Sequence, residues 1–137
     1  MRLKRSYKRL NLQLYLSIPL MTSTNHDHRL VSEATAVACR PYTAPFVKHV
    51  YCYEVMSATE WSINANANVF IPICYNDITK YLDKKLKALS MYKSQEKPYP
   101  HTRSVRSVEN HARYRGNVVG VEAAECFYPL LVQGIDI

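Results

Sequence analysis

Residues 24–41 read TNHDHRLVSEATAVACRP, a polar cluster followed directly by a short helical pattern. The cluster consists of five side chains of polar or metal-ligating type: Asn25, His26, Asp27, His28 and Arg29. Imidazole and carboxylate groups bind metals and transfer protons, so their grouping at the mouth of a helix predicts a metal or acid–base site. The alternative interpretation is a polar loop that caps the helix and leaves both histidines in water.

The apolar residues after this cluster predict a helix from about Asp27 to Cys39, with Thr24 or Asn25 as its cap. They form one stripe at helical spacing, which we expect to be buried. The stripe consists of Leu30, Val31, Ala34, Val37 and Ala38. The pair Arg40-Pro41 ends the helix, because the residue before a proline disfavours helical angles.

The segment before the cluster alternates apolar and polar residues, which predicts a strand leading into it. The apolar positions are Leu12, Leu14, Leu16 and Ile18, and the positions between them are Gln13, Tyr15 and Ser17. A signal-like segment is the alternative for residues 1–21, because a basic start precedes the apolar run. Polar residues interrupt that run, and it is too short to span a bilayer.

Residues 47–56, VKHVYCYEVM, are rich in β-branched and aromatic residues and predict a second strand. Polar side chains follow it, among them Thr59 and Glu60, at the end of a strand where open α/β sheets often place functional residues. The alternative is a capped turn in which Trp61 anchors the core.

Three further elements are expected along the rest of the chain. Residues 69–74 predict a short strand, and Pro72 within it favours a sheet edge. A helix follows with Asp77 as its cap, and its buried stripe is Ile78, Leu82, Leu86 and Leu89. A last helix is expected from Ser104 to about Phe127, in which Gly116 and Gly120 would let another backbone approach closely.

The amino-acid composition restricts the classes of protein to which this chain can belong. The chain has 137 residues, of which 47% are hydrophobic and 21% charged, as expected for one globular domain over residues 1–137. It contains only three glycines and no glycine-rich phosphate loop, which argues against dinucleotide-binding and P-loop enzymes. The four cysteines form no C-x-x-C pair, so we expect buried reduced thiols and a cytoplasmic location.

Four segments that occur in one order resemble the C-terminal portion of the LmbE/PIG-L family of zinc-dependent N-deacetylases. They are NHDHRLVSEATAVACRP, VYCYEVMSATEW, NVFIPICYNDITKYLDKKLKALSMYKSQ and HTRSVRSVENHARYRGNVVGVEAAECF. The resemblance covers residues 22–130 and implies a partial Rossmann-like α/β fold, a small sheet with about three helices. It also implies hydrolysis of N-acetylglucosamine-like sugars or related amides.

The resemblance also assigns roles to residues of the first cluster. The family's H-P-D-H-like motif supplies a zinc ligand through its last histidine, so His28 resembles that metal ligand. Asp27 resembles the carboxylate that orients the catalytic groups, and Asn25 stands where many members have an acid–base histidine. Arg29 and Glu60 are expected near the bound substrate.

The family's A-H-P-D-D-E motif, which supplies the other two zinc ligands and the general base, is absent from this sequence. A catalytic zinc needs three protein ligands and one open position. We therefore expect a truncated deacetylase that is inactive as this chain alone, and that pairs with a chain carrying the missing half or with a second copy.

Two alternatives to this hypothesis remain. The first is a non-catalytic binding or assembly module that keeps the fold. The second is a basic nucleic-acid-binding protein, since the formal net charge is +7. The basic residues are spread over three regions without any nucleic-acid-binding motif, so we expect neither a nucleic-acid nor a membrane partner.

Overall fold

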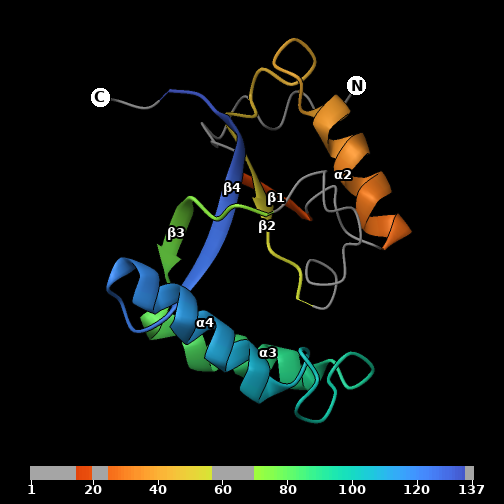
Figure 1. Ribbon diagram of the computed structural model, residues 1–137. Helices are drawn as coiled ribbons and strands as arrows, with labels where there is room; N and C mark the ends of the chain where they lie inside the picture. The colour runs from red at the N-terminus through yellow and green to blue at the C-terminus, as the bar shows by residue number, and fades with distance from the viewer. Residues whose placement is uncertain (1–14, 20–24, 57–69, 135–137) are drawn as a thin grey trace.

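The computed structural model describes residues 15–19, 25–56 and 70–134, which form a four-stranded mixed sheet with three α-helices (Figure 1). The elements are β1 (Tyr15–Pro19), α2 (His26–Ala38), β2 (His49–Tyr53), β3 (Cys74–Asp77), the 3₁₀ helix η1 (Thr79–Tyr81), α3 (Leu82–Met91), α4 (Val105–Val119) and β4 (Ala124–Val132). The strand order is β1-β2-β4-β3, with β1 parallel to β2 and β4 antiparallel to both of its neighbours. The predicted α/β class and the number of helices are confirmed.

The strand predicted from the alternation over residues 12–18 is present as β1, with residues 12–14 outside the described part of the chain, and the predicted helix is present as α2. The Asn25 side chain accepts a hydrogen bond from the backbone N–H of Asp27 at 3.0 Å, so Asn25 is the helix cap. The helix ends at Ala38, close to Pro41 as predicted. Because β1 and β2 run parallel, their carboxyl ends meet at one edge of the sheet, and α2 starts after β1 has reached that edge.

The predicted buried stripe of α2 is wrong. Leu30, Val31 and Val37 are 49%, 52% and 53% exposed. The buried side of the helix instead carries Ser32, which is 1% exposed, and continues to Cys39 after the last turn. The buried side of the helix thus carries small side chains. Periodicity alone cannot predict which of two adjacent helix faces will meet the sheet.

Two separate clusters of buried side chains form the core. The first lies between β2 and the segment after α2, and the second between α3, α4 and the start of β4. The first consists of Cys39, Ala44, Val47, Val50 and Cys52, and the second of Ile78, Leu82, Ala112 and Ala123. The second cluster confirms most of the predicted stripe of α3. In Figure 1, α3 and α4 lie side by side next to the end of the sheet from which β4 starts.

The predicted strand at residues 69–74 lies later in the chain than expected. The described residues 70–73 are not a strand, and β3 begins at Cys74. Pro72 cannot donate a backbone hydrogen bond, which explains why pairing starts after it. The predicted edge position is confirmed among the described strands, since β3 pairs with β4 at the end of their order.

The last predicted helix is too long. Ser104 caps it as predicted, by accepting a hydrogen bond from the Ser107 backbone N–H at 3.1 Å. The helix ends at Val119, because Gly120 adopts a left-handed conformation with φ of 76°. The chain then turns back into β4, so Cys126 belongs to a strand and not to a helix.

Helix α4 and the start of β4 are in direct backbone contact at Gly116. A Cβ atom there would lie 2.6 Å from the Val121 carbonyl oxygen and 2.7 Å from the Ala123 nitrogen. The predicted close approach of another backbone is therefore confirmed at Gly116. Within the described residues, no helix is long and apolar enough to cross a membrane.

We expect Gly116→Ala to lower the free energy of unfolding by up to about 2 kcal/mol, because the added methyl meets backbone atoms that cannot move aside. Overpacking costs about 1–3 kcal/mol, and the roughly 1 kcal/mol by which alanine is favoured over glycine inside a helix offsets part of that cost. Urea denaturation measures the change. Gly120→Ala is the matched control, since its Cβ would meet nothing within 4 Å and only the left-handed φ is strained. A larger loss for Gly120→Ala than for Gly116→Ala would contradict the packing described here.

The exposure of the Leu30 face of α2 can be tested by substituting leucine by alanine at one buried and one exposed position. We expect Leu82→Ala to cost about 2–5 kcal/mol, because Leu82 is only 4% exposed and its removal leaves a cavity. Leu30→Ala should cost less than about 1 kcal/mol, since this side chain is half exposed. Chemical denaturation measures the unfolding free energy of both variants. Equal losses of free energy would indicate that Leu30 is buried, as the sequence predicts.

Candidate functional site

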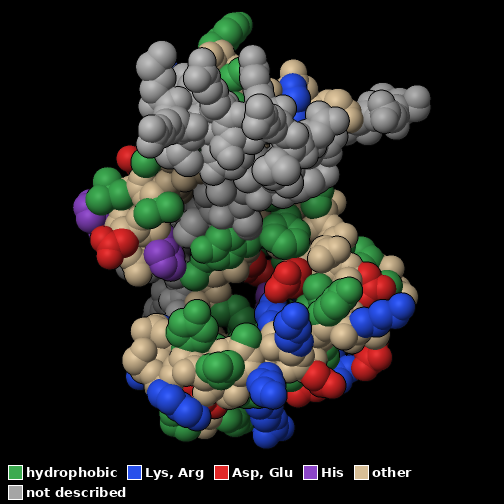
Figure 2. All heavy atoms as spheres, turned by 180° about the vertical axis from the view of Figure 1, so that it is seen from behind, with side chains coloured by type: hydrophobic (Ala, Val, Ile, Leu, Met, Phe, Trp, Pro, Cys, Tyr) green, Lys and Arg blue, Asp and Glu red, His purple; other side chains and the backbone are tan. Residues whose placement is uncertain are grey.

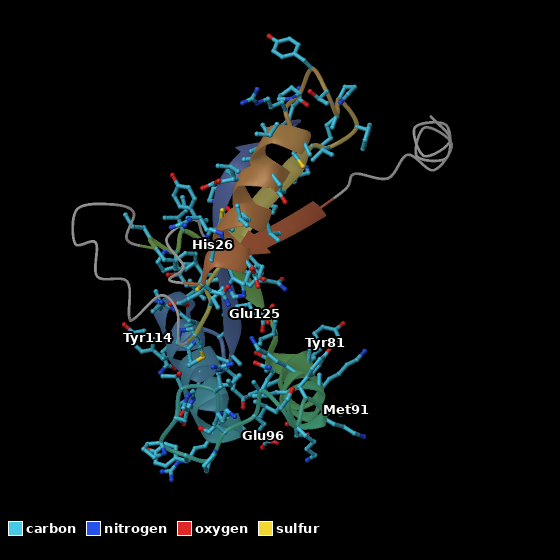
Figure 3. All side chains as sticks on the ribbon, turned by 90° about the vertical axis from the view of Figure 1, so that its right-hand side faces the viewer. His26, Tyr81, Met91, Glu96, Tyr114 and Glu125 are labelled. Atoms are coloured by element: carbon cyan, nitrogen blue, oxygen red, sulfur yellow. The ribbon has the colours of Figure 1, made fainter. Side chains whose placement is uncertain are left out.

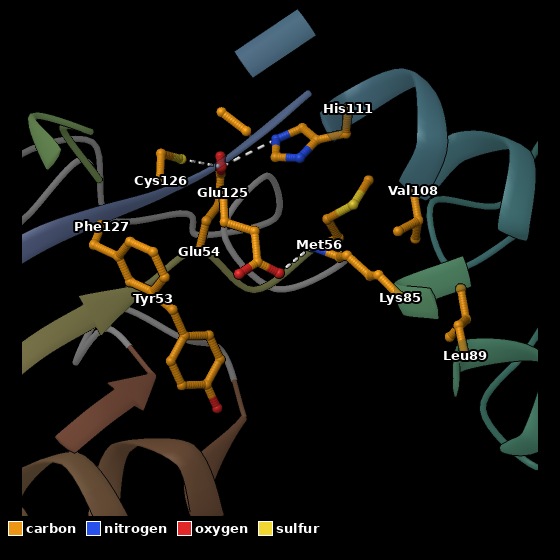
Figure 4. Close-up of a pocket in the computed structure, with 11 residues that line it drawn as sticks. Tyr53, Glu54, Met56, Lys85, Leu89, Val108, His111, Glu125, Cys126 and Phe127 are labelled. Carbon is orange, nitrogen blue, oxygen red and sulfur yellow. Dashed lines mark hydrogen bonds and ion pairs between the residues drawn. The ribbon is translucent and has the colours of Figure 1, made fainter. Parts of the chain in front are cut away.

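A pocket of about 390 Å³ opens where the end of β2 and the start of β4 meet helices α3 and α4 (Figure 4). It is lined by Tyr53, Glu54, Met56, Lys85, Leu89, Val108, His111, Ala124, Glu125, Cys126 and Phe127. We call it the Glu54 pocket. Its volume falls in the range of small-molecule sites, and its mixture of apolar walls with a few polar groups is typical of them.

The carboxylate of Glu54 is the centre of a polar network in the pocket wall. Arg115 donates two hydrogen bonds to it, from Nη2 to Oε1 at 2.7 Å and from Nε to Oε2 at 3.2 Å. Nε2 of His111 lies 3.0 Å from Oε2, and the Cys126 thiol donates to the same oxygen at 3.2 Å. The Glu54 side chain is only 14% exposed, so this network replaces most of its hydration.

Burial alone would raise the pKa of Glu54, because it removes water from the charged form. The hydrogen bonds from His111 and Arg115 outweigh that effect, and together with the His111 charge and the Cys126 bond they lower the pKa from 4.5 to about 2. Glu54 is therefore ionised at every pH at which the fold is ordinarily handled. It acts as a fixed acceptor and not as a proton donor.

The pKa of the Cys126 thiol is raised, whereas that of Glu54 is lowered. Burial and the neighbouring Glu54 carboxylate raise the pKa of its thiol to about 12. The thiolate is the nucleophilic form of cysteine, and it is absent here at neutral pH. Cys126 is thus a hydrogen-bond donor to Glu54 and not a candidate nucleophile.

A second ion pair lies at the rim of the pocket. Nζ of Lys85 on α3 is 2.6 Å from Oε1 of Glu125 on β4, and both side chains are a little over one third exposed. In Figure 2, Lys and Arg side chains are frequent over the part of the molecule formed by α3 and α4, with Asp and Glu side chains among them. The positive charge of this region is therefore partly balanced at short range.

The sequence-predicted residues lie at the start of α2. Asn25 is occupied in capping the helix, and Asp27 is exposed in its first turn. Arg29 Nη2 lies 3.0 Å from Nδ1 of His26, while His28 is half-buried. Figure 3 shows His26 at the end of α2 nearest to the part of the molecule that carries Glu125. Glu60 lies outside the described residues.

Within residues 15–19, 25–56 and 70–134, no three His, Cys, Asp or Glu side chains are arranged so that they could hold a metal. Asp27 and His28 therefore do not form a zinc site with other described residues. The role of His28 as a metal ligand stays a prediction.

Sequence reasoning missed the residues of the Glu54 network. Glu54 ends a strand pattern, His111 and Arg115 are four residues apart on α4, and Cys126 lies in a segment predicted as helix. The spacing of the histidine and the arginine was the available signal, because residues four apart in a helix share one face. The partner on β2 depends on the tertiary fold.

The network predicts how stability depends on pH. The Glu54 pKa is lower in the folded state, so its stabilising contribution is complete above its ordinary value of 4.5 and is lost as the pH falls toward 2. Glu54→Gln should flatten the pH dependence of the unfolding free energy between these values. Near pH 7 it should cost about 3–5 kcal/mol, because it leaves the buried Arg115 charge without its partner.

Glu122→Gln is the matched control for Glu54→Gln. It removes the carboxylate that faces Arg113 at 2.7 Å, but this side chain is 61% exposed. Chemical denaturation at several pH values compares the two variants. A similar loss of unfolding free energy in both variants would mean that the Glu54 network contributes no more to stability than an exposed ion pair.

Comparison with known proteins shows a likeness to a solved structure. No protein-family model matches this chain, and no curated protein sequence matches it. The fold is similar to the crystal structure of the conserved protein TT1542 from Thermus thermophilus, with a TM-score of 0.60 and 26% sequence identity. The likeness covers 98% of this chain and 60% of TT1542, so the chain spans about 60% of the length of that protein. The chain has the α/β arrangement of a larger solved protein.

Proposed function

We propose that this chain is the C-terminal portion of a LmbE/PIG-L-type zinc-dependent N-deacetylase with a Rossmann-like sheet. On this proposal it binds an N-acetylglucosamine-like sugar or a related amide but does not hydrolyse it alone. The observation that carries the proposal is the position of Asn25 to His28. They begin α2 after β1, a strand parallel to β2, and open α/β sheets bind ligands at the carboxyl ends of such strands.

The likeness to TT1542 supports the view that the fold belongs to a larger α/β protein, since 40% of that protein has no counterpart here (100% minus the 60% covered). The free side of β1 supports it too. Within the described residues β1 pairs only with β2, and the face of α2 that carries Leu30 and Val31 is exposed. A further strand–helix unit, from another chain or a second copy, would cover both.

We expect no turnover because this chain does not supply a complete set of zinc ligands. The described residues do not bring three metal ligands together, and the sequence lacks the A-H-P-D-D-E motif that would supply two of them and the base. His28 would then contribute one ligand to a site completed elsewhere, with Asp27 and Asn25 in support. Arg29 and Glu60 would contact the sugar.

A non-catalytic binding module is the second candidate, and the Glu54 pocket favours it. Eleven described residues of this one chain line this pocket. A nucleic-acid-binding role is a third candidate that rests on net charge alone. Binding of DNA or RNA that weakens steeply with salt would support it.

The proposal predicts the behaviour of the purified chain. We expect less than one equivalent of bound zinc and no release of acetate from N-acetylglucosamine, because one histidine cannot form a catalytic zinc site. Metal analysis and an acetate-release assay measure the two quantities. A full equivalent of zinc together with turnover by the chain alone would contradict the expected incompleteness.

His28 can be tested in the same preparation. We expect N-acetylglucosamine, titrated by NMR, to bind His28→Ala about tenfold more weakly than the unaltered chain, the effect of one lost polar contact of about 1.4 kcal/mol. His101→Ala is the matched control, because His101 is exposed and accepts a hydrogen bond from the Arg103 backbone, outside the cluster at the start of α2. Equal affinity in both variants would remove His28 from the binding site.

A further inference from the structure

The ion pair of Lys85 and Glu125, at the rim of the Glu54 pocket, keeps unused hydrogen-bonding groups. An ammonium group has three donors and a carboxylate has two oxygens, and the contact between Nζ and Oε1 at 2.6 Å uses one of each. Within the described part of the chain, neither side chain makes another hydrogen bond. The two side chains are 36% and 37% exposed, so a ligand can reach the remaining donors and the second oxygen.

The other charges of the pocket are less accessible and are engaged with one another. The carboxylate of Glu54 is 14% exposed and lies against the guanidinium of Arg115 and the imidazole of His111. The Lys85–Glu125 pair is therefore the charged group of the pocket wall that a ligand contacts most readily.

An ammonium group in contact with a carboxylate forms a dipole, which selects the charge pattern of a ligand. A ligand with one charge is attracted by one member of the pair and repelled by the other at nearly the same distance, so the two energies largely cancel. A ligand with both charges can lie antiparallel to the pair, with each charge beside its opposite. In an α-amino acid the ammonium and carboxylate groups share one carbon atom, so they are about as close together as Nζ and Oε1 are here.

The remaining walls of the pocket suit an apolar side chain. In Figure 4 the Lys85–Glu125 pair lies among the lining residues, with Phe127 on one side and Leu89 on the other. Transfer of apolar surface from water to such walls is favourable. The volume of about 390 Å³ is in the range of small-molecule sites. The apolar and aromatic walls are formed by Tyr53, Met56, Leu89, Val108 and Phe127.

We propose that the Glu54 pocket binds a free α-amino acid with an apolar or aromatic side chain. The carboxylate of the ligand accepts a hydrogen bond from Nζ of Lys85, and its ammonium group donates to the second oxygen of Glu125. The side chain of the ligand lies against the apolar walls. This site uses neither zinc nor His28, so it is independent of the deacetylase proposal.

Three probes that share one aromatic body test the charge pattern. L-Phenylalanine has both charges, 2-phenylethylamine has only the ammonium group, and 3-phenylpropionate has only the carboxylate. NMR titration of the full chain at neutral pH, in the presence of EDTA, measures the three dissociation constants. We expect phenylalanine to bind about tenfold more tightly than either other probe, the effect of one further hydrogen bond between charged groups. No binding of phenylalanine, or equally tight binding of a probe with one charge, would overturn the proposal.

Substitutions at the ion pair should change the preference in opposite directions. Lys85→Met leaves the Glu125 carboxylate alone, so 2-phenylethylamine should bind at least as tightly as phenylalanine. Glu125→Gln leaves the Lys85 ammonium alone, so 3-phenylpropionate should do so instead. Lys93→Met is the matched control, because it removes the lysine of an exposed ion pair, 4.0 Å from Glu96, that does not line the pocket. An unchanged order of affinities in both pocket variants would refute the assigned contacts.

The NMR spectra also locate the ligand without any substitution, so the proposal can be decided even if a variant does not fold. Phenylalanine should shift the methyl signals of Leu89 and Val108, which line the pocket, and leave those of Leu30 on the exposed face of α2 unchanged. Unchanged signals of Leu89 and Val108 would place the ligand elsewhere and refute the site.

EDTA separates this proposal from the preceding one. Binding of phenylalanine that survives removal of metal supports the pocket whatever the outcome of the zinc and acetate assays. Failure of phenylalanine to bind would leave the expectations for His28 and N-acetylglucosamine unchanged.

Discussion

The bidentate contact between Arg115 and Glu54 is the constraint on which the arrangement of this molecule depends. It joins the end of β2 to the middle of α4, two elements whose apolar side chains belong to different core clusters. Both partners are largely removed from water, with 16% and 14% of their side chains exposed. Such a pair adds little net stability relative to an apolar pair of the same shape, but it is costly to break. Its main effect here is to fix the position of α4 relative to the sheet.

That fixed position organises the polar groups around it. His111 lies four residues before Arg115, so the same helix face presents both donors to the one carboxylate. Cys126 on β4 completes the set from the sheet side. The carboxylate thus connects three elements, and its own charge does not change near neutral pH. The result is a rigid polar wall beside an apolar pocket.

The sequence was most informative where one local signal decides the structure. Asn25 and Ser104 cap helices where capping residues were predicted, and the alternation in β1 predicted a strand. It failed where two structures are compatible with one pattern. The stripe of α2 that contains Leu30 is exposed, because the side of the helix that carries the small residue Ser32 is the buried one. The apolar pattern after Gly120 is compatible with a longer helix, but the chain reverses there into β4.

The two candidate sites also differ in whether a local sequence signal reveals them. The cluster from Asn25 to His28 is contiguous, so it could be found by inspection, although its chemistry depends on residues elsewhere. The Glu54 network could not be found in this way, because its members are separated by up to 72 positions and meet only when the sheet forms (Cys126 to Glu54). Pairing of β2 with β4 is what creates the second site.

The contact at Gly116 has a consequence for the pocket. At Gly116 the backbone of α4 touches the chain just before β4, so main-chain atoms limit how closely these two elements approach each other. One wall of the cavity is therefore anchored by a residue that does not line it. The spacing of α4 and the start of β4 thus depends in part on the missing side chain of Gly116, whereas the volume of the pocket between them also depends on the side chains that line it.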